Sequence, residues 1–168
     1  EVFSNEGIGT LIFASEYRQI RAANKRDAAS ILRLTREAME QHQLTERSEA
    51  AIEEKLDDYF IYELDENPVA CVALRRFPEE NTGEIAHLYV NPLHGNRGIG
   101  QKLAQYAGEI ASEAGLKNLI TLSTQAFAFF QNKAGFTEGT IDDLPAERRA
   151  EYEAGGRKSK ILIKHLSD

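Results

Sequence analysis

A short apolar strand that runs into a glycine-rich loop and then a long amphipathic helix constrains the fold of this chain most. The strand is predicted at Glu84–Val90, the loop at 93–100 (LHGNRGIG) and the helix from there to about Ala114. The first N–H groups of a helix have no partner within it, and glycines let an anion approach the backbone closely. The junction therefore predicts a pyrophosphate site to which Arg97 and Lys102 add charge, although an ordinary glycine turn fits the same residues. It matches neither the P-loop nor the dinucleotide-binding fingerprint.

Two further strands are predicted before the strand of this junction, and tight turns join the three. We therefore expect them to form an antiparallel meander. They are predicted at Phe60–Leu64, Val69–Phe77 and Glu84–Val90. Hydrophobic periodicity and capping residues predict the other elements. The further strands are expected at Tyr17–Ala22, at Asn118–Ser123, from Phe136 and at Lys160–Lys164. The further helices are expected from Asn24 to about His42, from Ser48, at Ala126–Ala134 and within Ala146–Glu153. The helix from Ser48 is expected to carry Tyr59 or Phe60 on its apolar face.

The composition argues against several classes of function. Lys and Arg total 20 against 27 Asp and Glu, and the resulting net charge of −7 disfavours a broad nucleic-acid surface. Cys71 is the single cysteine and is expected in the core, which excludes a disulfide framework and a thiolate zinc site. The four histidines lack metal-ligand spacing, and no apolar run reaches the length of a membrane span. We therefore expect no nucleic-acid, membrane or metal partner, and a cytoplasmic location.

The glycine loop and its surroundings resemble the GNAT family of N-acetyltransferases. The family pattern Gln/Arg-x-x-Gly-x-Gly/Ala is matched at Gly98 and Gly100, whereas Gly95 stands where the family has Gln or Arg. The resemblance covers about 17–166 and implies an α/β (α+β) fold: a single GNAT-like domain with a central, mixed, mostly antiparallel sheet of six to seven strands flanked by about four helices. Further matches lie at Leu88, Val90, Pro92, Phe130, Gly135 and Phe136.

A narrower resemblance is to the acetyltransferase domain of the N-acetylglutamate synthase family. It rests on the stretch 143–149 (DLPAERR), on the Arg47-Ser48 pair and on 157–160 (RKSK). Residues 1–10 are similar to the segment that joins that family's amino-acid-kinase-like domain to its acetyltransferase. We therefore expect 1–14 to be a connector from an upstream domain and 15–168 to be the acetyltransferase domain. The same motifs fit a fused homologue and the stand-alone synthase, and a homo-oligomer stays open.

The family resemblance implies acetyl-CoA as co-substrate. A bulge in the strand would turn a backbone N–H near His87 or Leu88 toward the thioester carbonyl. The end of the strand would hold the pantetheine arm as an added strand, and the helix start would hold the pyrophosphate. The residues implied are Leu88, Tyr89, Val90, Asn96, Arg97, Gly98, Ile99, Gly100 and Gln101.

Four residues are candidates for proton transfer. Glu84 lies where many family members carry a glutamate, and it is the first candidate for the base that deprotonates the acceptor amine through water. His87 is the second candidate. The structural alternatives are a solvated strand-end charge for Glu84 and a core or pocket-wall position for His87. Because Phe129-Phe130 occupies the place of the family's tyrosine acid, the thiolate would take its proton from Ser123, Thr124 or water, or would need no acid.

The narrower resemblance implies L-glutamate as acceptor, acetylated by direct attack in a ternary complex as the first step of arginine biosynthesis. An acceptor with two carboxylates calls for arginine or lysine donors. Arg47 and Arg157 match arginines of the synthase motifs, and Ser159 and Lys160 are weaker additions. Arg148-Arg149 lies among acidic residues and is interpreted as part of a salt-bridged helix. Acetyl transfer to another amino acid or small amine, and non-catalytic binding of acyl-CoA, stay open.

Overall fold

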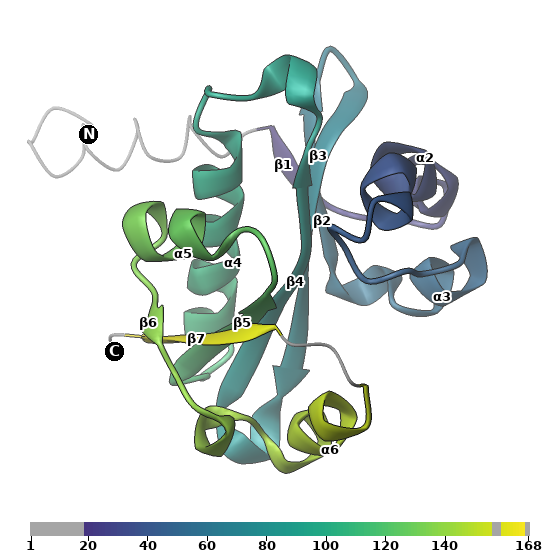
Figure 1. The fold of residues 1–168 in the computed structure, drawn as a ribbon. Coiled ribbons are helices and arrows are strands. Elements are labelled where there is room, and N and C mark those ends of the chain that lie inside the picture. Colours follow the sequence, from purple (N-terminus) through teal and green to yellow (C-terminus); the bar gives the residue numbers. More distant parts are fainter. Residues whose placement is uncertain (1–18, 156–158, 167–168) are drawn as a thin grey trace, which may run out of the picture.

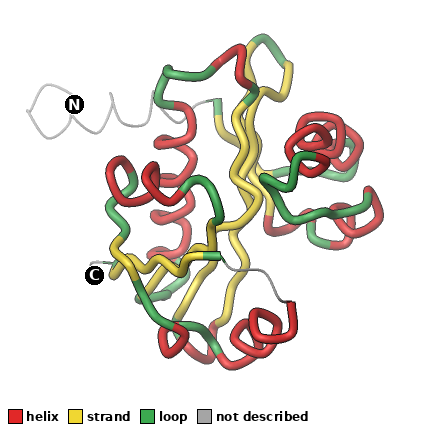
Figure 2. Tube along the Cα trace, in the orientation of Figure 1, coloured by secondary structure: helices red, strands yellow, loops and turns green. Residues whose placement is uncertain are grey.

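The computed structural model describes residues 19–155 and 159–166 and shows a seven-stranded sheet between helices (Figure 1, Figure 2). The strand order is β1-β2-β3-β4-β5-β7-β6, and every neighbouring pair is antiparallel except β4–β5. The expected mixed, mostly antiparallel sheet and its meander are therefore confirmed. The strands are β1 (Ile20–Ala22), β2 (Tyr59–Leu64), β3 (Asn67–Phe77), β4 (Thr82–Val90), β5 (Asn118–Ser123), β6 (Thr137–Glu138) and β7 (Lys160–His165).

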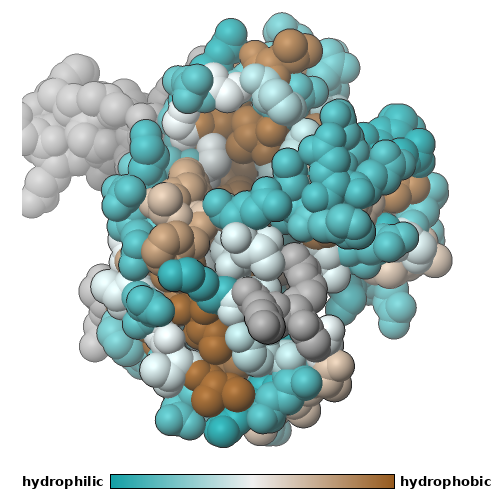
Figure 3. Space-filling model, in the orientation of Figure 1, coloured by the Kyte–Doolittle hydropathy of each residue, from teal (hydrophilic) through white to brown (hydrophobic). Residues whose placement is uncertain are grey.

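Five α-helices belong to the described residues, one more than the expected four. In Figure 1, α2 and α3 lie on one side of the sheet, α4 and α5 lie on the other, and α6 lies near its lower end. Polar side chains cover α2 and α3 on the face shown in Figure 3, whereas apolar ones gather over α5. No helix in the described ranges has the length and hydropathy to cross a membrane. The helices are α2 (Asp27–Glu40), α3 (Glu49–Glu54), α4 (Ile99–Glu113), α5 (Phe127–Lys133) and α6 (Ala146–Gly155).

The core lies on both faces of the sheet because successive strand side chains alternate between them. In β2, Phe60 and Tyr62 pack into the cluster that also holds Leu103 of α4. Tyr59 and Ile61 pack instead into the cluster formed with α2 and α3. The sequence prediction that placed Tyr59 on the apolar face of a helix was therefore wrong, because α3 ends at Glu54 and Tyr59 begins a strand.

Capping interactions fix the chain on either side of α2 and α3. The backbone N–H of Asn24 donates to the Asp27 carboxylate at 2.7 Å, as the sequence predicts, although the helix itself begins at Asp27. Ser48 caps α3, since its hydroxyl oxygen accepts from the backbone N–H of Ala51 at 3.1 Å. The first cap fixes the start of α2, and the second fixes the C-terminal end of the loop 41–48, which contacts β4 through Thr45 and His87. The expected connector 1–14 lies outside the described residues.

A bulge interrupts β4 opposite the middle of β3. The pairing shifts so that His87 and Leu88 together lie opposite Val72. His87 has a φ of +50°, a left-handed conformation in which histidine is found more often than most residues. The bulge expected from the family resemblance is thus present at the expected residues.

The parallel pairing of β4 with β5 is short. It begins at Thr82 with Asn118 and ends at Glu84 with Ile120, after which the two strands separate. The half of β4 that follows pairs with β3 alone. A gap therefore opens in the middle of the sheet, next to the bulge, between the unpaired edge of β4 and that of β5.

Candidate active site

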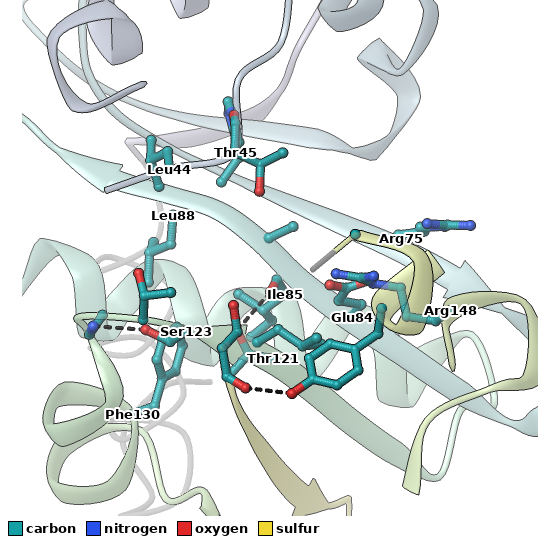
Figure 4. A pocket seen from close by; sticks show the side chains of 18 of the residues that line it. Leu44, Thr45, Arg75, Glu84, Ile85, Leu88, Thr121, Ser123, Phe130 and Arg148 are labelled. Carbon is teal, nitrogen blue, oxygen red and sulfur yellow. Dashed lines mark hydrogen bonds and ion pairs between the residues drawn. The ribbon is translucent and has the colours of Figure 1, made fainter. Parts of the chain in front are cut away.

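A pocket of about 320 Å³ lies where β4 and β5 separate (Figure 4). Its walls come from residues 43–45 and 47 between α2 and α3, from 84–88 of β4, from 121–123 of β5 with Thr124 after it, and from α6. In Figure 4, Glu84 and Arg148 lie together on one side of the pocket, away from Ser123 and Phe130. Seven residues proposed from the sequence line this pocket, namely Arg47, Glu84, His87, Leu88, Ser123, Thr124 and Ser159.

Glu84 is buried, with 5% of its surface exposed, so it is not a solvated strand-end charge. Its Oε1 accepts a hydrogen bond from Nε of Arg148 at 2.9 Å. Burial raises the pKa of Glu84, and the charge and hydrogen bond of Arg148 oppose this rise. A carboxylate whose pKa is shifted upward is a better proton acceptor near neutral pH than an exposed one.

Ion pairs attach α6 to the rest of the molecule. None of its described side chains is buried. Arg75 of β3 donates to both carboxylate oxygens of Glu151, at 2.8 and 3.0 Å, and also pairs with Glu147. The interpretation of Arg148-Arg149 as part of a salt-bridged helix is confirmed, since Arg148 pairs with Glu151 and Arg149 with Glu153. The sequence did not predict the shortest contact of Arg148, which is with Glu84 in the pocket.

His87 is held through both ring nitrogens. Nε2 lies 2.7 Å from the backbone carbonyl oxygen of Thr45, and Nδ1 lies 3.1 Å from the hydroxyl of the fully buried Tyr59. Burial and the nearby Arg47 lower the pKa of His87 to about 4, so the ring is neutral at physiological pH. Because both nitrogens are engaged, His87 is placed to hold its neighbours rather than to take a proton from a ligand.

Among the described residues, Arg47 forms no ion pair with a carboxylate. Its Nη1 donates to the Tyr59 hydroxyl at 2.8 Å. Of the three arginines that line the pocket, Arg75 and Arg148 form ion pairs with carboxylates, whereas within the described ranges none pairs with Arg47. Arg157, the second predicted acceptor arginine, lies outside those ranges.

Ser123 and Thr121 fix the β5 side of the pocket. The Ser123 oxygen accepts from the backbone N–H of Ala126 at 2.7 Å, which leaves its O–H as a donor. Thr121 donates to the carbonyl oxygen of Ile85 at 2.8 Å and bridges the two strands just where they separate. Cys71 is fully buried, and burial raises the pKa of its thiol to about 12, so it is unsuited to be a nucleophile.

The glycine loop lies outside this pocket and has the form of an open cradle. Gly98 is the N-cap of α4 with a φ of +74°, and a Cβ built on it would meet no atom within 4 Å. Asn96, Arg97 and Gln101 are exposed, whereas Ile99 is buried in the core and can offer a ligand only its backbone. The unpaired edge of β4 and this cradle together fit an extended ligand that ends in an anionic group.

Three other predicted residues do not reach the pocket. Tyr89 packs beside the cluster beneath α2 and α3, and Val90 packs on the α4 side. Lys160 lies with Nζ 4.2 Å from the ring centroid of Phe127. Among residues 19–155 and 159–166, no three His, Cys, Asp or Glu side chains gather into a group that could hold a metal ion.

Comparisons with known sequences show which proteins the chain is similar to. A family model described as "Acetyltransferase (GNAT) family" matches residues 26–136. Two relatives named amino-acid acetyltransferase, from Serratia proteamaculans and Proteus mirabilis, are each 39% identical to the chain over 166 residues, or 99% of its length. The chain spans 37% of the length of each of these curated relatives.

Solved structures share the fold. N-acetylglutamate synthase from Neisseria gonorrhoeae, complexed with coenzyme A and N-acetyl-glutamate, matches with a TM-score of 0.85 and 36% identity over 89% of this chain and 35% of that one. The same enzyme complexed with coenzyme A and L-arginine matches with a TM-score of 0.79 and 33% identity, over 89% of this chain and 33% of that one. PaiA N-acetyltransferase from Thermoplasma acidophilum, complexed with coenzyme A, shares the fold with a TM-score of 0.67 at 16% identity over 87% and 97%.

His87→Asn is expected to reduce the loss of stability on acidification. His87 has a folded-state pKa of about 4 against an ordinary value of 6.5, so protonation favours the unfolded chain as the pH falls from 6.5 toward 4. The stability is therefore present above pH 6.5, and about 2 kcal/mol of it is lost by pH 5. Urea denaturation at pH 7.5 and pH 5 measures this difference, and asparagine suits the left-handed backbone.

The matched control is His42→Asn, since His42 is exposed and also has a positive φ of +60°. The control is expected to keep the pH dependence of the wild type. Equal pH dependence in His87→Asn and the wild type would show that the buried imidazole does not resist protonation.

Proposed function

The chain belongs to the GNAT family of acetyltransferases, and we propose that it transfers the acetyl group of acetyl-CoA to the α-amine of L-glutamate. The observation that carries the proposal is one pocket that joins a buried carboxylate, Glu84, to an arginine, Arg47, that forms no ion pair with any carboxylate of the described residues. The first suits the deprotonation of an ammonium, and the second suits the binding of an acidic acceptor. The names of the sequence relatives and the N-acetyl-glutamate bound to the Neisseria enzyme support the choice of acceptor. In the resembled synthase family this reaction begins arginine biosynthesis.

We assign acetyl-CoA, which supplies the acetyl thioester, to the unpaired edge of β4 and the cradle at the start of α4. Backbone groups between Leu88 and Val90 would hold the extended arm in the place of a neighbouring strand. The free N–H groups that follow Gly98, with Arg97 beside them, would hold the pyrophosphate. This arrangement leaves the bulge at His87 and Leu88 next to the pocket, where a backbone N–H would stabilise charge on the thioester oxygen.

The acceptor would lie between the loop 41–48 and α6. Glu84 would take a proton from its ammonium group through a water molecule, which leaves the amine free to attack. Ser123, whose hydroxyl can donate, would supply a proton to the departing thiolate. Arg47 and Arg157, with Ser159 beside them, would pair with the two carboxylates of glutamate. Lys160 is a weaker candidate, because its ammonium lies over the Phe127 ring.

Gly98→Val is expected to weaken binding of acetyl-CoA while the protein stays folded. The side chain would project into the open cradle and also strain a backbone with a φ of +74°. Gly115→Val separates these effects, because Gly115 lies just beyond the other end of α4 with a φ of +86° and has equally open surroundings. Calorimetric titration should show weaker CoA binding in Gly98→Val alone. Normal binding by a well-folded Gly98→Val protein would remove the cradle from the proposal.

Glu84→Gln is expected to lower kcat at neutral pH by about 10²–10⁴-fold, the usual contribution of a general base. Higher pH should restore part of the rate, because more of the acceptor is then free amine. Since burial raises the pKa of Glu84, kcat of the wild type should fall as the pH drops through that raised pKa. Thiol release measures both profiles, and the exposed Glu79→Gln is the control. A rate that Glu84→Gln leaves unchanged across pH would exclude Glu84 as base.

The acceptor assignment predicts a preference for glutamate over glutamine. An arginine that faces an uncharged amide loses charge-assisted hydrogen bonds, so glutamine should be poorer by about ten- to a hundredfold in kcat/KM. Aspartate keeps both charges, but its amine is displaced by one methylene, which should lower mainly kcat. Arg47→Ala and Arg157→Ala should each raise KM for glutamate and leave KM for acetyl-CoA near the wild-type value.

Arg36→Ala, an exposed charge change on α2, is the control for these two variants and should leave both KM values unchanged. Comparable kcat/KM values for glutamate, glutamine and a polyamine would overturn the glutamate assignment even if acetyl transfer were observed. Binding of acetyl-CoA without turnover of any amine would favour a non-catalytic module.

A further inference from the structure

Arg47 is anchored by a neutral group, unlike the other two arginines of the pocket. Arg75 and Arg148 donate to the carboxylates of Glu151 and Glu84. Arg47 donates instead to the hydroxyl of Tyr59, and its guanidinium carbon lies 5.8 Å from the centroid of that ring. A carboxylate at this position would hold the guanidinium equally well and would also cancel its charge. The phenol fixes the group without cancelling its charge.

The hydrogen bonds behind Arg47 can run in one direction only. The carbonyl oxygen of Thr45 can only accept, so Nε2 of His87 must carry a proton. Burial lowers the pKa of His87 to about 4, and the neutral ring then has a lone pair on Nδ1. The Tyr59 hydroxyl must donate to that lone pair, which turns its own oxygen toward Arg47 as an acceptor. Each group thus fixes the next, from the loop 41–48 to the guanidinium.

We propose that Tyr59, oriented by His87, is a positioning residue that fixes Arg47 in the acceptor site and thereby sets the preference for an acidic over a neutral acceptor. The inference rests on the proposed function, because it takes Arg47 to bind an acceptor carboxylate. Tyr59 is fully buried and does not line the pocket, so it acts through Arg47 and not by contact with substrate. A guanidinium held in one orientation binds a carboxylate without first losing its conformational freedom.

Tyr59→Phe tests this inference, because it removes one hydroxyl and keeps the buried ring. KM for glutamate should rise about tenfold, the effect of weakening one charge-assisted hydrogen bond. KM for glutamine should change little, so the preference for glutamate falls by the same factor, while KM for acetyl-CoA stays constant. The matched control is Tyr62→Phe, a buried tyrosine of the same strand that packs on the opposite face. It should leave all three values unchanged.

A double-mutant cycle with Arg47→Ala shows whether Tyr59 acts through Arg47. In the Arg47→Ala background, Tyr59→Phe should change KM for glutamate by less than about twofold, since the group it positions is gone. An undiminished effect in that background, or an unchanged preference in Tyr59→Phe alone, would overturn the inference. If the wild type itself does not distinguish glutamate from glutamine, the proposed function fails first, whatever Tyr59 does.

A pair of substitutions at His87 keeps the inference testable if Tyr59→Phe folds poorly. His87→Ala removes the acceptor that orients the Tyr59 hydroxyl and should reduce the preference for glutamate. His87→Asn keeps an amide oxygen that can accept from Tyr59 and should retain more of the preference. An equal preference in His87→Ala and the wild type would contradict the orienting role, and KM for acetyl-CoA reports whether each variant is folded.

Discussion

The separation of β4 from β5 is the constraint on which the rest of the site depends. Two adjacent parallel strands normally share hydrogen bonds along their length, but here the pairing ends at Glu84 and Ile120. Beyond that point Thr121 satisfies the carbonyl of Ile85 with its side chain, so a buried polar group is not left unpaired. The bulge at His87 bends the same strand. A closed sheet would leave neither the pocket nor a free strand edge.

The sequence predicts the framework well because its signals are local. Three correct predictions depend only on residues close together in the chain. They are the strand at Asn118–Ser123, the cap at Ser48 and the glycine at the start of α4. The predicted turn between β2 and β3 is also present, although its two central residues, Asp65 and Glu66, have positive φ angles and neither is a glycine. The seven-stranded sheet, the bulge and the family follow from such local patterns together with the resemblance.

The parts of the site that depend on distant contacts could not be predicted in the same way. Arg148 has acidic neighbours within its own helix, and a helical pattern alone favours pairs with them. It does pair with Glu151, but its shorter contact is with Glu84, which lies 64 residues away in the chain and meets Arg148 only because α6 lies near the end of the sheet (Figure 1). The sequence pattern assigned Tyr59 to the helix that precedes β2, and an assignment to the wrong element predicts the wrong contacts. Its contacts with Arg47 and His87 appear only in the folded chain.

The two chemical requirements of the proposed reaction oppose each other, and the pocket separates them. The proposed base is a carboxylate, whereas an acidic acceptor needs a cation, and the two would neutralise each other if they paired within one small cavity. Here Glu84 is engaged by Arg148 from α6, and Arg47 is engaged by Tyr59 from β2. Burial raises the pKa of Glu84 in spite of its arginine partner, which favours proton uptake. Because Arg47 is anchored by an uncharged group, its charge is available to an acceptor while Glu84 is available to the ammonium group of the same molecule.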